Sequence, residues 1–156
     1  MATELIANGT QNVAPNAAVI WDTASVSDGA VYFRPGSGAI LLPSRASRTY
    51  VGCGCNRRLL YTEYLVEFHG NVAVPENGTV GPISFAVDIE GETYSPSIAT
   101  STPAATLQFN NIGASIIVRV PAICRCVKIS MRNVGENQSS ISNPNMLVTF
   151  QDVRAG

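Results

Sequence analysis

Four cysteines stand in two pairs of the same spacing: Cys53 with Cys55, and Cys124 with Cys126. Residues i and i+2 of a strand point to the same side, so two adjacent strands would bring all four sulfur atoms into one patch. Three kinds of chemistry are then open: reduced thiols, disulfides within or between chains, or a zinc site with four cysteine ligands. Because zinc sites more often use Cys-x-x-Cys spacing, the sequence does not decide among the three.

The other candidates for chemistry predict no enzyme. His69 is the single histidine, with Glu67 on the same expected strand face, but no Gly-x-Ser-x-Gly nucleophile motif accompanies them. Asp88, Glu90 and Glu92 recur at every second residue, yet they lack the order of a calcium-binding loop and fit a solvated hairpin tip. We therefore expect no catalytic residues and no cofactor apart from the zinc ion considered above.

The composition describes a globular domain with few charges. Of 156 residues, 46% are hydrophobic and only 13% are charged, and the net charge is −1. Such a chain can bury a core but has no bulk positive field to hold nucleic acid. Residues 29–62 contain five arginines and no acid, whereas residues 59–118 contain six acids and no base. These blocks are either solvated faces or opposite faces of neighbouring subunits that meet in an oligomer.

Alternation of apolar and polar residues predicts an all-β fold. It is clearest over residues 64–74, where Tyr64, Val66 and Phe68 fall on one face and Leu65 on the other. Further strands are predicted at 3–7, 17–22, 30–33, 38–42, 83–89, 105–109, 114–120, 123–131 and 146–150. Turn residues separate these runs, and no stretch has the period of an amphipathic helix. We predict an antiparallel jelly-roll β-sandwich with about 8–10 short strands.

The chain is expected to form one domain. Residues 1–16 are predicted to be a short N-terminal arm with the first strand, flexible until it docks, and residues 17–156 a single jelly-roll domain. The stretch at 95–106 is expected to be a long loop. There is no secretory signal and no apolar run of the roughly 20 residues that a membrane helix needs, so we expect cytoplasmic synthesis and no membrane partner.

One segment is apolar on both faces. In a two-layer sandwich, such a strand at residues 59–66 favours cover by another chain. Most of its large side chains must also supply the core. The subunit interface is predicted to include Leu59, Tyr61, Tyr64, Val66 and Phe68. Cyclic threefold symmetry is the natural closure for jelly-roll subunits, so we expect a homotrimer.

Three segments carry a resemblance to a known family: VAPNAAVIWD at 13–22, YLVEFHGNVAV at 64–74 and GPISFAVDIEG at 81–91. With the first cysteine pair, which Arg57 and Arg58 follow, they resemble small C1q/TNF-like jelly-roll proteins of Gram-positive bacteria and their phages. The resemblance spans nearly the whole chain and implies a trimer that decorates a particle or binds a surface ligand. It carries no catalytic residues over. The chain departs from many such proteins by lacking a stalk, which favours a compact decoration subunit over a long fibre.

The sequence therefore predicts a non-enzymatic bacteriophage protein, a capsid decoration or head-surface subunit that acts as a homotrimer on the virion surface. Its expected partners are copies of itself and the major capsid protein or another virion component. The alternative is a receptor- or glycan-binding module of a phage or of a bacterial spore or cell surface. Loops 43–58 and 91–106 would then carry the site, with Tyr50, Tyr94 and Trp21 as candidates for stacking on a sugar.

Overall fold

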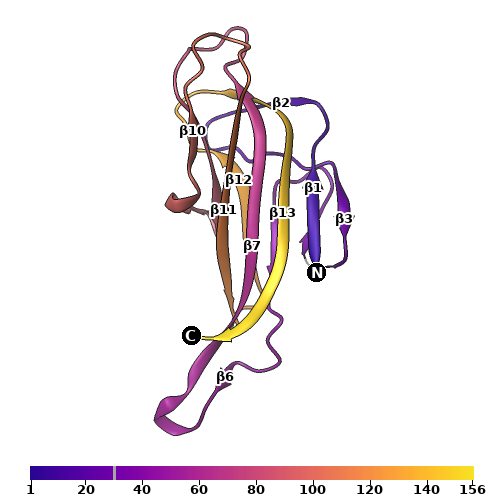
Figure 1. Ribbon diagram of the computed structural model, residues 1–156, viewed down its shortest axis with the longest axis vertical. Coiled ribbons are helices and arrows are strands. Elements are labelled where there is room, and N and C mark those ends of the chain that lie inside the picture. The colour runs from indigo at the N-terminus through magenta and orange to yellow at the C-terminus, as the bar shows by residue number, and fades with distance from the viewer. Residues whose placement is uncertain (30) are drawn as a thin grey trace.

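A computed structural model describes residues 1–29 and 31–156 as two antiparallel β-sheets that share one core (Figure 1). The strands are β1 (Ala2–Ile6), β2 (Thr10–Val13), β3 (Thr23–Ser27), β4 (Tyr32–Phe33), β5 (Ile40–Pro43), β6 (Tyr50–Val51), β7 (Arg58–Ala73), β8 (Ile83–Ile89), β9 (Glu92–Thr93), β10 (Ala99–Ser101), β11 (Asn110–Pro121), β12 (Cys126–Asn133) and β13 (Ser139–Ala155). Two short 3-10 turns, η1 (Gly54–Asn56) and η2 (Ser95–Ser97), complete the elements. The predicted all-β jelly roll is confirmed, but its described part has thirteen strands where about 8–10 short ones were predicted, and β7, β11 and β13 are 16, 12 and 17 residues long.

The strand order brings distant segments together. Sheet A has the order β11-β7-β13-β1-β3, with β2 paired to β13 and β6 paired to β7. Sheet B has the order β10-β8-β12-β5-β4, with β9 paired to β8. Thus β7, at the centre of the chain, lies between β11 and the C-terminal β13, and these three strands form the longest ladder of the molecule (Figure 1).

The inner face of β7 anchors the core. Tyr64, Val66 and Phe68 are all 0% exposed, which confirms the predicted alternation. The Tyr64 ring meets Phe150 of β13 edge-on, with centroids 6.1 Å apart, and its hydroxyl donates a hydrogen bond to the Pro43 carbonyl at 2.6 Å. Since Pro43 ends β5, this side chain links the two sheets. Burial raises the pKa of Tyr64, and a hydrogen bond and the positive charge of Arg45 oppose that rise.

Two predicted strands are wrong. Residues 17–22 form only isolated bridges, at Ala18 and Trp21. Residues 105–109 lie before β11 begins, and Leu107 has a φ of 60°, a left-handed conformation that a strand does not accommodate. In residues 17–22 the apolar side chain of Trp21 fills the core from a loop, and in residues 105–109 Leu107 and Phe109 are exposed at the surface. Both segments therefore have apolar residues at strand-like spacing without belonging to a strand.

Other boundaries shift. The predicted strand 123–131 begins only at Cys126, because Ile123 lies in the turn before it and is 64% exposed. The last strand starts at Ser139 and not at 146. The expected loop 95–106 contains η2 and β10. Of the predicted strand 30–33, residue 30 lies outside the described residues, and the rest corresponds to β4.

The N-terminal segment is not a free arm. Both strands within residues 1–16 belong to sheet A: Ala2 pairs with Thr149 of β13, and Val13 pairs with Ser139 of the same strand. Leu5 is 0% exposed and packs into the common core. Backbone pairing on this scale already orders the segment that we expected to stay flexible until docking.

A hairpin of residues 50–59 projects beyond the sandwich, at the bottom of Figure 1. Its two arms pair from Tyr50 and Leu59 outward. The tip closes tightly because Gly52 has a φ of 99° and a Cβ there would lie 2.5 Å from the carbonyl oxygen of Asn56. Only glycine fits that position, so this residue determines the shape of the tip.

Candidate functional site

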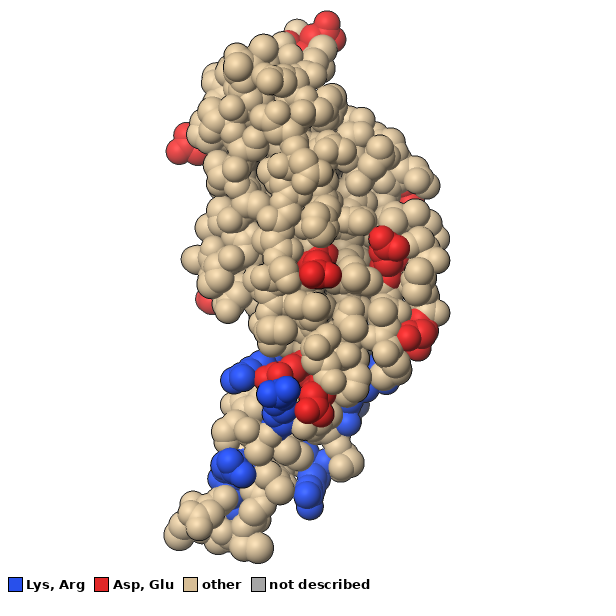
Figure 2. Space-filling model, viewed as in Figure 1, with Lys and Arg blue, Asp and Glu red and all other residues tan. Residues whose placement is uncertain are grey.

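Basic side chains gather around the projecting hairpin, at the lower end of the face in Figure 2, whereas the visible charges above them are acidic. We call this region the basic end and define it by Arg48, Arg57, Arg58, Arg119, Arg125 and Arg154. Backbone hydrogen bonds hold its segments together: Leu60 N donates to Thr49 O, and Ala122 N donates to Leu60 O, both at 2.9 Å. Three arginines of the block noted at 29–62 thus meet Arg119, Arg125 and Arg154 at one end of the molecule, whereas Arg34 of that block lies elsewhere.

Glu63 of β7 ties three strands at the basic end. It is only 7% exposed. Arg119 Nε on β11 donates to its Oε1 at 2.9 Å, and Arg154 Nε on β13 lies 3.3 Å from its Oε2. Arg154 also lies 3.5 Å from the exposed Asp152. The two arginine side chains are 62% and 63% exposed, so one buried carboxylate positions two solvated cations.

Four arginines of the basic end have no such partner. Within the described part of the chain, Arg48, Arg57, Arg58 and Arg125 form no ion pair with an acid. Arg57 instead lies over the ring of Tyr50, 4.7 Å from its centroid. The basic end therefore keeps positive charge for an anion that this chain does not itself supply there.

The cysteines lie at this end in two separate places. Cys53 and Cys55 are exposed at the hairpin tip, while Cys124 is half-buried in the turn after β11 and Cys126 is exposed at the start of β12. All four are free. Among residues 1–29 and 31–156, no group of three or more His, Cys, Asp and Glu could hold a metal ion. One chain therefore does not unite the four sulfur atoms, and disulfide or zinc binding stays a prediction about contacts between chains.

Three of the predicted interface residues are wrong for that role. Tyr64, Val66 and Phe68 are 0% exposed because they fill the core of a single chain, so no second chain can reach them. Leu59, in the hairpin, and Tyr61, just beyond it, are half-buried and remain candidates. The outward residue of this strand is Leu65, one position away from the predicted set.

A strip of three aliphatic side chains, with Thr149 and Glu67 beside them, crosses the outer side of sheet A. Ile117 of β11 pairs with Leu65 of β7, which pairs with Thr149 of β13, and Leu147 lies in the next row beside Glu67. We call these five residues the sheet A face. Ile117 is 46% exposed and the others are half-buried. Sequence alternation indicated Leu65, but only strand register joins it to the others.

His69 lies on the same outer side, and its contacts do not form a catalytic site. It is exposed, and its ring covers Gly113, where a Cβ would lie 2.8 Å from its Cδ2 atom. Glu67 accepts a hydrogen bond from the hydroxyl of Ser115 at 3.4 Å. Asp88 is buried and pairs with Arg132 at 3.1 Å, so it is not free to chelate calcium with its acidic neighbours. These contacts are structural.

The predicted aromatic ligand residues are scattered. Tyr50, on the hairpin, is 42% exposed, and Tyr94, beside β8 of sheet B, is 38% exposed. Trp21 is 0% exposed and cannot stack on a sugar. An aromatic that sequence reasoning missed is Tyr32, which is 63% exposed and pairs with Leu41 at the edge of sheet B.

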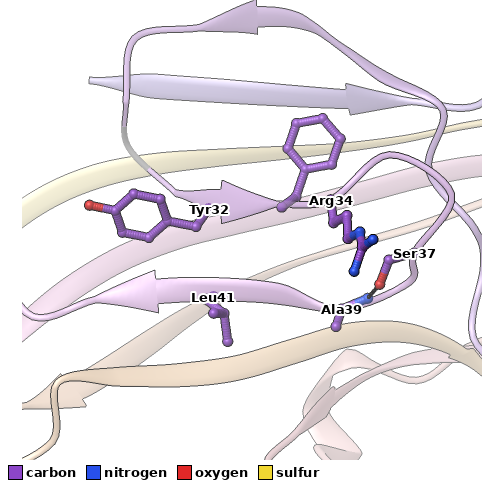
Figure 3. Close-up of a pocket in the computed structure, with 6 residues that line it drawn as sticks. Tyr32, Arg34, Ser37, Ala39 and Leu41 are labelled. Atoms are coloured by element: carbon purple, nitrogen blue, oxygen red, sulfur yellow. Dashed lines mark hydrogen bonds between the residues drawn. The ribbon is translucent and has the colours of Figure 1, made fainter.

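Tyr32 and Leu41 border a shallow hollow of about 300 Å³ (Figure 3). Arg34, Ala39 and Ser37 continue its wall. The Ser37 hydroxyl accepts a hydrogen bond from the Ala39 amide at 3.1 Å, which fixes the turn between β4 and β5. The Tyr32 ring and the Arg34 side chain extend away from each other along this wall, and an exposed aromatic and a cationic donor are groups that sugars and apolar side chains can both use (Figure 3).

Comparisons with known proteins identify the fold. No protein-family model matches this chain, and no curated protein matches it by sequence. Among solved structures, the globular domain of zebrafish complement 1qA matches with a TM-score of 0.58 at 8% identity, covering 95% of this chain and 94% of that one. Eiger TNF from S. frugiperda matches with a TM-score of 0.57 at 16% identity, over 97% and 93%. Murine APRIL gives 0.52 at 8% identity, over 96% and 99%.

The described residues contain no helix long and apolar enough to span a bilayer. At these identities the likeness establishes architecture and leaves function to the surfaces described above. The full-length coverage of both chains and the two-sheet topology together show that the chain has the C1q/TNF-like jelly-roll fold.

Proposed function

We propose that this protein is a non-enzymatic structural subunit that assembles as a homotrimer and decorates the surface of a bacteriophage virion. The observation that carries the proposal is the sheet A face, whose aliphatic side chains Ile117, Leu65 and Leu147 no other element covers within the described residues. The C1q/TNF-like resemblance supports the trimer, and the low charged fraction of 13% supports a surface that is largely hidden in an assembly.

The shape of the sheet A face suits contact between copies. Ile117, Leu65 and Thr149 form a row across three long strands, so the strip belongs to the most extensive ladder and its backbone is held by pairing on both sides of β7. A partner could bury it with little loss of conformational freedom. A stable interface buries about 1,200–2,000 Å² in total and uses about 20–30 residues a side, so the sheet A face would form the centre of a larger contact.

Ile117→Asp tests the assembly. Because this side chain is 46% exposed, a charge there is tolerated by the folded chain but not by an interface. Light scattering is expected to give about 50 kDa for three wild-type chains and the 16.5 kDa of one chain for the variant. Ile98→Asp is the matched control: it is 45% exposed, lies beside sheet B and should leave the trimer intact. A wild type that is monomeric, or two variants that behave alike, contradicts the proposal.

The virion location has its own test. Phage particles from cells that carry this gene would be purified on a density gradient and digested for peptide mass spectrometry. We expect the protein in the particle band, at a copy number divisible by three, and expect the Ile117→Asp protein to be lost from it. A protein that stays in the soluble fraction would contradict decoration even if it is trimeric.

The hollow at Tyr32 favours a second candidate, a glycan-binding module. Its exposed aromatic ring and adjacent Arg34 could stack on and hydrogen-bond a sugar. Tyr32→Ala should then abolish binding to host envelope polysaccharide in a calorimetric titration, and Tyr94→Ala should not. Equal binding by both variants and the wild type would remove this candidate.

A further inference from the structure

We propose that the two cysteine pairs form a zinc site between copies of this chain: Cys53 and Cys55 of one copy and Cys124 and Cys126 of the next bind one Zn²⁺ through four thiolates. The inference rests on the proposed self-assembly, because a single chain holds the two halves of the site apart. Four cysteine sulfurs are a common ligand set for a structural zinc ion, which is tetrahedral and closed to water.

The projecting hairpin carries its pair beyond the reach of the other. Ala122 N donates to Leu60 O at 2.9 Å, so the turn after β11 lies level with Leu60. The hairpin continues outward by two paired residues, about 7 Å at the usual strand rise, and then by the tip at 52–57. Figure 1 shows the tip standing clear of the sandwich. A projecting pair is placed to meet a neighbouring molecule.

The tip has a defined conformation. Gly52 and Gly54 adopt φ values of 99° and 56°, which other residues rarely take. Asn56 N donates a hydrogen bond to the carbonyl of Cys53 at 3.1 Å and closes the turn. Both thiols are exposed on this short turn, with no side chain between them. The fold thus exposes both thiols on one ordered turn, so little backbone ordering remains when they bind.

The surrounding charge favours zinc over a disulfide. Four thiolates and one Zn²⁺ carry a net charge of about −2, whereas a disulfide is neutral. Arg57 and Arg58 follow the first pair, and Arg125 lies within the second. None of these three arginines forms an ion pair with an acid in the chain as described. A negative metal site supplies the counter-charge they lack. The thiol protons are released to solvent as the metal binds.

Symmetry fixes the stoichiometry. Each chain has one hairpin pair and one turn pair, so a closed ring of copies has as many sites as chains, about one zinc per chain. Protein reconstituted with Zn²⁺ and freed of excess metal would be analysed by mass spectrometry of the elements. Replacement by Co²⁺ should give the intense thiolate-to-metal charge-transfer band of a sulfur-rich tetrahedral site.

Mixing two complementary variants tests whether two chains share each zinc site. Two double variants are needed: Cys53→Ser/Cys55→Ser and Cys124→Ser/Cys126→Ser. Each should bind no zinc. Both should still fold, because three of the four replaced side chains are exposed. Co-expressed in equal amounts, the two variants should regain about a quarter of the wild-type zinc, since half of the chains meet a suitable neighbour half of the time. A site within one chain would regain none.

Light scattering of every sample, with and without chelator, separates the outcomes. Zinc that returns only in the mixture supports the site. Zinc retained by either double variant, or an assembled wild type that binds none or forms disulfides instead, overturns the site and leaves the proposed assembly standing. A wild type that stays monomeric in zinc and in chelator overturns the proposed function itself.

Discussion

Glu63→Gln is expected to lower the free energy of unfolding by about 1–2 kcal/mol. The variant keeps the size of the side chain but removes the charge that Arg119 and Arg154 share. Those arginines are mostly exposed, so water solvates them when the carboxylate is gone. The loss is therefore limited to two weakened hydrogen bonds and the burial of an amide in place of an acid.

Removing the two arginines is expected to cost more. In Arg119→Gln/Arg154→Gln, the Glu63 carboxylate, only 7% exposed, keeps its charge and loses both cations. An uncompensated buried charge costs about 3 kcal/mol or more. Each single arginine variant should cost less than about 1 kcal/mol, because the other arginine still pairs with the acid. The loss of unfolding free energy in the double variant should thus exceed the sum of the losses in the two single variants.

Urea unfolding at one fixed protein concentration measures these differences, because assembly would otherwise change the apparent stability. Asp152→Asn is the control: its side chain is 60% exposed and its contact with Arg154 spans 3.5 Å, so we expect a change below about 0.5 kcal/mol. If Glu63→Gln costs as much as the double arginine variant, or if the arginine effects simply add, then burial of the carboxylate does not control the network.

Three further substitutions test other parts of the fold. Phe68→Ala should cost about 3–5 kcal/mol in thermal unfolding, because it empties a fully buried site; a cost below about 1 kcal/mol would contradict the assigned core. Tyr64→Phe should cost about 1–2 kcal/mol, since the Pro43 carbonyl loses its donor. Burial raises the pKa of Tyr64, so the folded wild type holds the phenol proton more tightly than the unfolded chain. The stability that this adds is lost as the pH rises above about 10. Tyr64→Phe should therefore lose less stability over that pH range, and the same fall of unfolding free energy with pH in both proteins would refute this. Gly52→Ala should distort the hairpin tip, seen as local amide shifts by NMR around Asn56, without changing global stability.

The core strand was predictable because both of its faces have a clear character. In β7, Tyr64, Val66 and Phe68 alternate with partly polar residues, and a one-residue slip would expose all three. The same logic misled the interface prediction, which included these inner residues. The strand predicted at 17–22 was wrong for a different reason: Trp21 is fully buried, but it fills the core from a loop that forms only isolated bridges.

The candidate sites depended on pairings that no local pattern contains. The sheet A face exists because Ile117 and Leu65, more than 50 residues apart, share a rung of the ladder. The basic end likewise joins Arg58, Arg119 and Arg154 from three separate strands. Sequence blocks of charge hinted at such a surface, but only the strand order shows which blocks meet. The hollow at Tyr32 was missed because a two-residue strand carries no periodicity.

The pairing of the first strand with the last sets a condition on biosynthesis. Ala2 lies opposite Thr149, so β1 leaves the ribosome long before its partner β13 is made, a delay of roughly 7–30 s at usual elongation rates. During that interval β1 can pair with β3 alone, and the apolar strands of the sandwich stand open to aggregation or to chaperones. Only when β13 has been made can it pair with β7 on one side and β1 on the other and complete the order of sheet A. We expect the nascent chain to stay protease-sensitive until the final strand has emerged, and then to become resistant abruptly.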